Sequence, residues 1–285
     1  MNNKSITLIE ILVVVLTISI LSSVIYVVSS GARERADFAK VLMFSTKLNS
    51  SLAENIVGQW DFNEGTGSSV YDSSGNGNTG TITGATWETN QSNCISSNCL
   101  VFDGTLGNYV QMSAISSLPA GKSFMISSWV YPEHTGTYRT IVGYNSTHRL
   151  LINSVGQMLS QQNGNFFSAG SGNVPNLKWT HVIYWYNIDE GTYGQERWYI
   201  NGIQSGASNN LASQIAEWDA AFKVGQYDLA NYPFKGKIDE IYFFDNYSSL
   251  SKINQIYITG LNNLFLKNQI SQNEYLERIK IASNE

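Results

Sequence analysis

The stretch WTHVIYWYN, residues 179–187, and the stretch SFMISSWVYP, residues 123–132, are the clearest strand-like segments of this 285-residue chain. Both are short and rich in aromatic and β-branched residues, which is typical of β-strands. Eight further segments share this character and are separated by Gly, Asn, Ser and Asp: 58–64, 99–104, 109–113, 139–145, 149–155, 196–202, 221–227 and 236–245. Ten such segments, with no long amphipathic helix between them, predict an all-β sandwich or barrel. Asn201-Gly202 has the chemistry of a hairpin turn, because both residues tolerate a positive φ.

The composition narrows the class of protein. Charged residues make up 14% of the chain and the net charge is −5, so no basic excess exists to neutralise the phosphates of a nucleic acid. The abundant Gly, Ser, Asn and Tyr suit short strands joined by many turns, and suit extracellular proteins. The three histidines, His134, His148 and His181, lack metal-ligand spacing, and two cysteines are too few for a zinc cluster of thiolates.

The first 56 residues differ from the rest. No charged residue occurs from Ile11 to Val28, so a transmembrane helix is expected over about residues 9–28. Apolar residues continue at helical spacing as far as Ile56, which predicts one long helix. Glu10 stands at the edge of the apolar span, where a carboxylate is costly and therefore indicates a function. The alternative is that Glu10 only reaches the lipid head groups.

The segment SITLIEILVVV, residues 5–15, resembles the processing motif of type IV prepilins. The resemblance implies a leader of residues 1–5, cleavage by a prepilin peptidase between Ser5 and Ile6, and a pilin-like helix over residues 6–56. It also implies that Glu10 pairs with the terminal amine of a neighbouring subunit in the bacterial cytoplasmic membrane. Ser5 departs from the family's usual Gly, and the span lacks the proline of many major pilins. The chain would cross this membrane once, with its C-terminal domain outside, and the protein would then enter a surface filament or a secretion pseudopilus.

The body of the chain, residues 57–258, resembles the laminin G-like, or concanavalin A-like lectin/glucanase, jelly roll. Six phrases follow that family's order: residues 60–84, 100–112, 123–133, 178–187, 197–203 and 234–257. The resemblance implies a domain that binds a glycan or a protein. The remaining residues, 259–285, suit two short helices around a polar turn, like a helical hairpin used for oligomerisation. A solvated tail with some helicity is the alternative.

Catalysis by glucanases of this fold needs two carboxylates about 5 Å apart on one strand face. In retaining glucanases of this fold the carboxylates come from a Glu-x-Asp-x-(x)-Glu strand. The nearest match here, Glu217-Trp218-Asp219, lacks the second glutamate of that pattern. Asp239 and Glu240 are adjacent, so on a regular strand their side chains would point to opposite faces. The sequence therefore predicts that the protein is not an enzyme, with a degenerate glucanase as the less favoured alternative.

Calcium is the one cofactor that the sequence suggests. Residues 72–78, DSSGNGN, are rich in oxygen donors and glycines. The family resemblance implies that a structural calcium ion joins the first strand to the last through Asp61, Asn76, Asn78 and Asp239. Alternatively, Asp72 and Asn76 only satisfy backbone amides as Asx turns.

Cys94 and Cys99 are expected to form a disulfide. The four residues between them can bring the Cα atoms within ~7 Å if they make a tight turn. Such a bond persists outside the cytoplasm, where the pilin-like topology would place this segment. Two free thiols are the alternative.

Together these features predict a type IV pilin-like or pseudopilin subunit that displays a jelly-roll head for a glycan or protein ligand. A purely structural subunit without a ligand is the alternative function.

Overall fold

The computed structural model describes residues 55–118, 121–133, 136–144, 148–162, 165–211, 220–227, 232–246 and 250–283, together with 15–17 and 19. The chain divides into two compact units, residues 1–48 and 49–285, which are treated separately. In the first unit the described residues are helical, and Ser19 Oγ donates to the Val15 carbonyl at 2.8 Å. The expected processing residues Ser5, Ile6 and Glu10, and nearly all of the expected membrane span, lie outside the described residues. Within the described residues, no helix combines the length and the apolar character that a membrane crossing needs.

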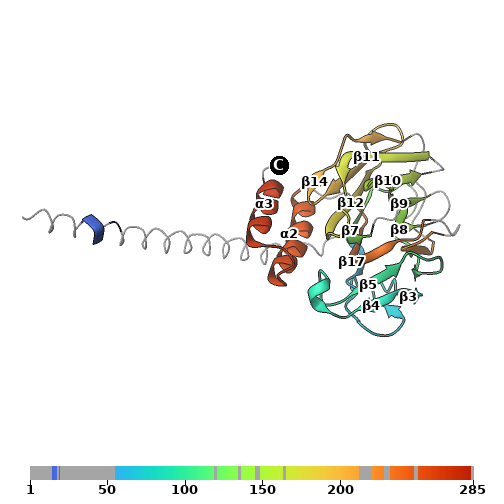
Figure 1. The fold of residues 1–285 in the computed structure, drawn as a ribbon. Helices are drawn as coiled ribbons and strands as arrows, with labels where there is room; N and C mark the ends of the chain where they lie inside the picture. Colours follow the sequence, from blue (N-terminus) through green and yellow to red (C-terminus); the bar gives the residue numbers. More distant parts are fainter. Residues whose placement is uncertain are drawn as a thin grey trace, which may run out of the picture. The chain divides into compact units, whose positions relative to one another are not determined.

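The second unit, called the head below, is a sandwich of two antiparallel sheets (Figure 1). Sheet A consists of β1 Ile56–Trp60, β4 Thr86–Glu88, β5 Cys99–Asp103, β7 Phe124–Pro132, β12 Thr180–Asn187, β13 Gln195–Ile200, β14 Ile203–Gln204, β15 Asn209–Asn210 and β17 Lys235–Phe244. Its order is β14-β13-β12-β7-β17-β5-β4, with β1 added beside β17 and β15 beside β13.

Sheet B consists of β2 Ser69–Val70, β3 Gly80–Thr83, β6 Tyr109–Met112, β8 Arg139–Gly143, β9 Arg149–Ile152, β10 Gln157–Gln162, β11 Asn165–Asn173 and β16 Phe222–Val224. Its order is β11-β10-β9-β8-β16-β6-β3-β2. Both sheets combine successive strands with neighbours that are distant in sequence, such as β7-β17 and β8-β16, as in a jelly roll. The predicted mainly β jelly-roll sandwich is therefore confirmed.

All ten predicted segments contain a strand, and the predicted Asn201-Gly202 turn joins β13 to β14 with positive φ at both residues. The sequence prediction missed β10 and β11, which read QMLSQQ and NFFSAGSGN. These strands are polar or Gly-rich, so strand propensity alone does not reveal them. Pairing supplies what their own propensity lacks, because β10 pairs with β9 and β11 pairs with β10.

The main core lies between the sheets. Trp60 of β1 packs edge-on against Phe222 of β16 and Phe243 of β17, with ring centroids 6.0 and 5.9 Å apart. Strand β12 is buried at every position and β7 at all positions but Tyr131, so their second face also needs a cover. Alternate β12 residues divide between two apolar clusters, because successive side chains of a strand point to opposite faces.

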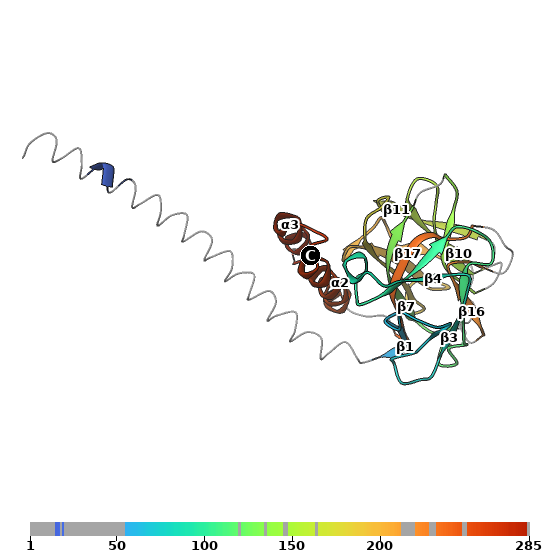
Figure 2. The same cartoon turned by 60° about the horizontal axis from the view of Figure 1, so that its bottom comes forward.

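A helical hairpin supplies that cover: α2, Leu250–Leu266, and α3, Gln272–Ser283. Ile253 and Ile256 of α2 join a cluster with Ile183 and Trp185 of β12. The two views show the hairpin beside sheet A and away from β10 and β16 of sheet B (Figures 1 and 2).

Aromatic stacking fixes the hairpin on sheet A. Tyr257 of α2 stacks on Trp129 and on His181, with ring centroids 5.9 Å apart in both pairs. Gly260 permits this approach, because a Cβ there would lie 2.4 Å from the Trp129 ring. The expected boundary between residues 258 and 259 falls inside α2, and the segment after it is part of the head's packing and not a solvated tail.

Candidate functional site

The disulfide loop, residues 94–99, is the structural centre of the candidate site. Cys94 and Cys99 are joined by a disulfide, with Cα atoms 5.5 Å apart, in agreement with the sequence prediction. The loop follows the single turn η1, Gln91–Asn93, and leads into β5. Six residues are thus closed into a tight ring whose backbone groups must find partners elsewhere.

The amide side of the disulfide loop is held by Asp239 of β17. The amides of Ile95 and Ser96 donate to Asp239 Oδ2 at 2.9 and 3.0 Å. Ser96 Oγ lies 3.1 Å from Asp239 Oδ1 and 3.0 Å from the carbonyl oxygen of Asp61, and its one proton serves one acceptor at a time. Burial raises the pKa of the Asp239 carboxyl to about 8, whereas the amide donors of Ser96 and Ile95 act in the opposite direction.

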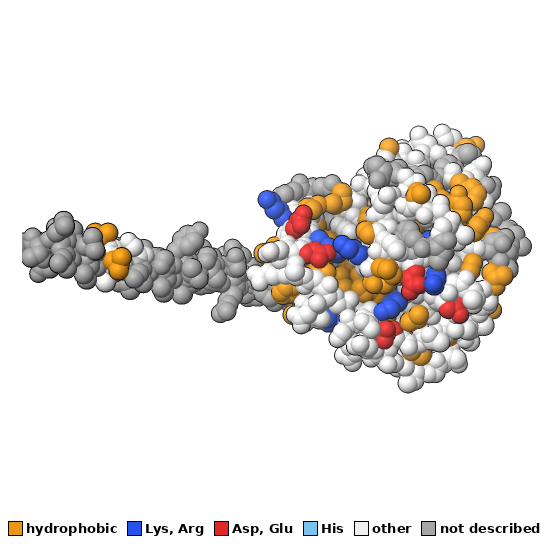
Figure 3. All heavy atoms as spheres, in the orientation of Figure 1, with side chains coloured by type: hydrophobic (Ala, Val, Ile, Leu, Met, Phe, Trp, Pro, Cys, Tyr) orange, Lys and Arg blue, Asp and Glu red, His pale blue; other side chains and the backbone are white. Residues whose placement is uncertain are grey.

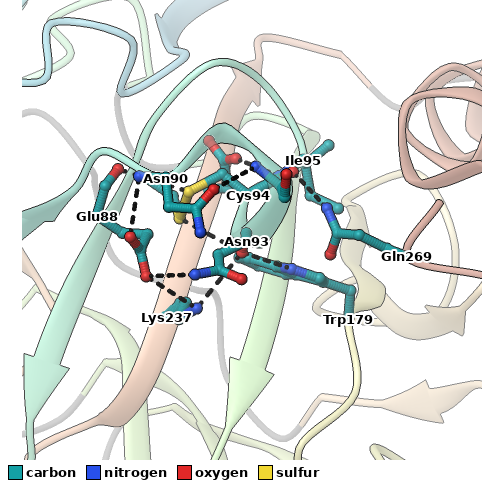
Figure 4. A network of polar contacts seen from close by, with 11 residues as sticks. Glu88, Asn90, Asn93, Cys94, Ile95, Trp179, Lys237 and Gln269 are labelled. Atoms are coloured by element: carbon teal, nitrogen blue, oxygen red, sulfur yellow. Dashed lines mark hydrogen bonds and ion pairs between the residues drawn. A yellow bond between two sulfur atoms is a disulfide. The ribbon is translucent and has the colours of Figure 1, made fainter. Parts of the chain in front are cut away.

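The carbonyl side of the disulfide loop is held by the helical hairpin. Lys267 Nζ donates to the carbonyl oxygens of Cys94 and Ser96, the first at 3.1 Å. Gln269 Nε2 donates to the Cys94 carbonyl at 2.8 Å, and Figure 4 shows this side chain reaching Cys94 from the hairpin. Strand β17 therefore binds the amide groups of the disulfide loop, and the helical hairpin binds its carbonyl groups.

A cleft of about 460 Å³ opens between the η1 turn that precedes the disulfide loop, sheet A and the hairpin. Aromatic, amide and cationic side chains line it together with Leu177, Leu264 and Ile270; they include Tyr131, Trp179, Asn93, Asn268, Gln269, Lys178, Lys237, Lys267 and Arg278. On the face of the head that Figure 3 shows, basic and acidic side chains lie interspersed with apolar ones. The cleft therefore offers mixed polar and apolar contacts.

Asn93 organises one wall of the cleft (Figure 4). Its backbone carbonyl oxygen accepts from Trp179 Nε1 at 3.1 Å and from Lys237 Nζ at 3.5 Å. Its side-chain Nδ2 donates to Glu88 Oε2 at 3.0 Å. Lys237 also pairs with Glu88 at 3.3 Å and lies over the Tyr131 ring, 5.4 Å from its centroid. These contacts fix the orientation of the groups that a ligand would meet.

The expectation that Asp239 and Glu240 point to opposite faces assumes a regular strand, and the strand is not regular at this point. The β17–β7 register shifts between Asp239 and Tyr242, and Glu240 has φ +50°. This β-bulge breaks the alternation of the strand. Burial and the negative charges of Asp239 and Asp61 raise the pKa of Glu240 well above its ordinary value. Neither Asp239 nor Glu240 lines the cleft, and Glu217 to Asp219 lie outside the described residues.

The residues expected to bind calcium fall into two groups. Asp61 and Asp239 meet through Ser96, whereas the side-chain amides of Asn76 and Asn78 both donate to the Val57 carbonyl, at 3.3 and 2.8 Å. In the parts of the chain that the structure covers, no three His, Cys, Asp or Glu side chains are grouped to hold a metal ion.

Asp72 orders the turn that contains Asn76 and Asn78. Its carboxylate accepts from the amides of Gln59, Ser74 and Asn78, each at 2.9 Å. The Asx-turn alternative therefore describes what Asp72 does in this structure.

Sequence reasoning does not locate the cleft. It assigns Lys267 and Gln269 to the C-terminal segment 259–285 and Trp179 to a strand-like segment. One signal was present: β7 and β12 are apolar on both faces, which requires a second covering layer.

Comparisons with known proteins agree on the fold. A laminin G-like family model, described as the concanavalin A-like lectin/glucanases superfamily, matches residues 103–254. No curated protein matches the chain in sequence.

Solved structures resemble the head at low sequence identity. Domain 4 of AbnA, a GH43 extracellular arabinanase from Geobacillus stearothermophilus solved with arabinotriose, is 21% identical at TM-score 0.53, over 71% of this chain and 98% of that one. The botulinum neurotoxin serotype D ligand binding domain, solved with N-acetylneuraminic acid, is 17% identical at TM-score 0.58, over 75% of this chain. The binding domain of Paraclostridial Mosquitocidal Protein 1 is 13% identical at TM-score 0.59, over 74%. The match covers 53% of each of these last two binding domains.

Proposed function

Because this chain belongs to the concanavalin A-like lectin/glucanases superfamily, we propose that its head is a carbohydrate-recognition module displayed by a type IV pilin-like N-terminal helix. The observation that carries the proposal is the cleft between the η1 turn, sheet A and the helical hairpin. Its volume of about 460 Å³ lies in the range of small-ligand sites.

The chemistry of the cleft suits a sugar. Asn93, Asn268 and Gln269 supply amide groups that can donate to and accept from hydroxyl groups. Tyr131 and Trp179, whose ring centroids are 5.6 Å apart, supply an apolar wall. Solved neighbours with arabinotriose and with N-acetylneuraminic acid support a carbohydrate ligand for this fold.

Ligand binding is tested with the full-length chain in detergent on a glycan array, followed by titration with the best glycan. Lys178→Ala and Gln269→Ala, both in the cleft lining, should each weaken binding by about tenfold, the loss of roughly one hydrogen bond. Lys280→Ala is the matched control, because Lys280 lies on α3 outside the cleft lining. A complete absence of glycan binding would favour the purely structural subunit.

The proposed display rests on the sequence at residues 5–15. Cleavage after Ser5 would leave Ile6 as the new terminus, and Glu10 would pair with the terminal amine of a neighbour in the membrane. N-terminal sequencing of protein isolated from cells should start at Ile6. A start at Met1 would remove the pilin-like role and leave the lectin-like head unaffected.

A structural calcium ion is a separate proposal for Asp61, Asn76, Asn78 and Asp239. Carboxylate and amide oxygens suit calcium, but Asp239 fits least well because both of its oxygens already accept hydrogen bonds. Calcium at a hundredfold excess over its Kd should raise the unfolding free energy by roughly 2.7 kcal/mol. Asp61→Asn should remove this difference. Equal melting temperatures in calcium and in chelator would leave the Asp72 turn as the whole explanation.

A further inference from the structure

The outer face of sheet B holds a buried arginine whose guanidinium is only partly satisfied by hydrogen bonds within the described residues. Arg149, the first residue of β9, is only 5% exposed. Its Nε and Nη1 atoms have no hydrogen-bond partner within the described part of the chain. A buried charge normally has an ionic or hydrogen-bonding partner, because its desolvation is costly.

Three aromatic rings surround this guanidinium. Arg149 Cζ lies 3.9 Å from the centroid of the Tyr227 ring, 5.4 Å from that of Tyr232 and 5.7 Å from that of Phe166. Tyr138 continues the group, with its ring 5.1 Å from Tyr232 and 6.3 Å from Phe166. We call Tyr138, Phe166, Tyr227, Tyr232 and Arg149 the ring cluster.

The strand register assembles the ring cluster from distant segments. Arg149 pairs with Gly143 of β8 on one side and with Gln161 of β10 on the other, and Gln161 pairs with Phe166 of β11. Gly143 leaves room for an aromatic neighbour, because a Cβ there would lie 2.5 Å from the Cβ of Tyr227.

The ring cluster is open to ligands at one end. Tyr138 is 37% exposed and Phe166 is 52% exposed, although aromatic side chains of this size usually bury most of their surface. None of the five residues lines the cleft between the η1 turn, sheet A and the hairpin. The two sites are therefore built from separate residues.

The cation–π contacts offset part of the desolvation of Arg149, but they supply no acceptor for its N–H groups. The missing partner is an anion with paired oxygens, and a carboxylate matches the two-pronged guanidinium. The exposed rings of Tyr138 and Phe166 add a flat apolar surface on which a sugar ring can lie.

We propose that the ring cluster binds the carboxylate of a hexuronic acid residue within an acidic glycan. Arg149 receives the carboxylate, and Tyr138 and Phe166 contact the pyranose ring. This site goes beyond the proposed lectin-like cleft, because it has its own residues and its own ligand class.

The test uses trigalacturonate and its carboxyl-reduced counterpart, titrated into the full-length chain in detergent. Wild-type protein should bind trigalacturonate at least about tenfold more tightly than the reduced sugar, the discrimination expected of a charge-assisted contact. Arg149→Gln should remove this preference. Lys223→Gln, which removes a cation over Tyr109 on the same sheet, should change it less than about twofold.

Further variants separate a binding role from a folding role. Phe166→Ala should weaken trigalacturonate binding while the melting temperature stays close to wild type, because the side chain is half-exposed. Lys178→Ala in the cleft should leave trigalacturonate binding unchanged, even where it abolishes binding of another glycan. The proposal is overturned if the acidic and reduced sugars bind equally, if neither binds, or if a folded Arg149→Gln protein keeps the preference.

Discussion

Along the strands of both sheets, alternate side chains point to the outer face, but sheet A and sheet B differ in what lies over that face. On sheet A, outward residues such as Ile183 and Trp185 are apolar, and the helical hairpin covers them. On sheet B, the outward position of β9 holds Arg149, beside rings that are partly exposed. The outer face of sheet A thus contributes to stability because the helical hairpin covers it. The outer face of sheet B instead carries a charged group beside partly exposed aromatic rings.

The largest expected effect compares two tyrosines, one on each face. Tyr257→Ala should lower the unfolding free energy by about 3–5 kcal/mol, because the ring is fully buried and stacks on both Trp129 and His181. Tyr138→Ala on sheet B should cost less than ~1 kcal/mol, because its ring is 37% exposed. Chemical unfolding followed by tryptophan fluorescence measures both. Similar losses for the two variants would remove the distinction between a covered and an open face.

The second prediction uses pH to probe the covered face. Burial lowers the pKa of His181 from 6.5 to about 3. The folded form is therefore favoured while His181 is neutral, and stability is lost as the pH falls from about 6.5 towards about 3. At pH 5 the loss from this residue is about 2 kcal/mol relative to neutral pH.

His181→Phe should make the stability of the head less sensitive to acid over that range. His148 provides an internal comparison, because burial lowers its pKa only to about 4, so its contribution levels off at a higher pH. An unchanged slope between pH 6 and pH 4 in His181→Phe would show that this histidine is already charged in the folded head.

The third prediction concerns the open face. Arg149→Met should raise the unfolding free energy by about 1 kcal/mol, because it removes a buried charge that is only partly satisfied by hydrogen bonds among the described residues and keeps a side chain of similar length. Thermal unfolding without ligand measures the change. A lower melting temperature would mean that the rings alone compensate the charge, and that Arg149 is a structural residue.

The fourth prediction concerns the disulfide. Replacing Cys94 and Cys99 by serine should cost less than about 2 kcal/mol, because a loop of this length removes little chain entropy and Asp239 and Lys267 still hold it. Binding at the cleft should fall more clearly than stability, since Asn93 precedes Cys94 directly. A loss of stability as large as that of Tyr257→Ala would place the loop within the folding core.

Sequence reasoning found what is encoded locally. Aromatic and β-branched runs such as 179–187 predicted strands, and Asn201-Gly202 predicted a turn, because each depends on neighbouring residues alone. The spacing of Cys94 and Cys99 belongs to the same class.

What could not be predicted depends on partners distant in the chain. The ring cluster requires the register that sets Arg149 opposite Gly143 and Gln161, and one sequence does not show that register. The bulge at Glu240 reverses the expected direction of a side chain for the same reason.

Lys267 donates hydrogen bonds to the disulfide loop and also lines the cleft, so the cleft is complete only when nearly the whole chain has been synthesised. Lys267 and Cys94 are separated by 173 positions, so the contact forms only after nearly the whole chain has emerged. A chain that ends before residue 267 retains the sequence of every strand but lacks the cleft-lining residues from Lys267 to Arg278. Ligand affinity would therefore distinguish complete chains from prematurely terminated ones.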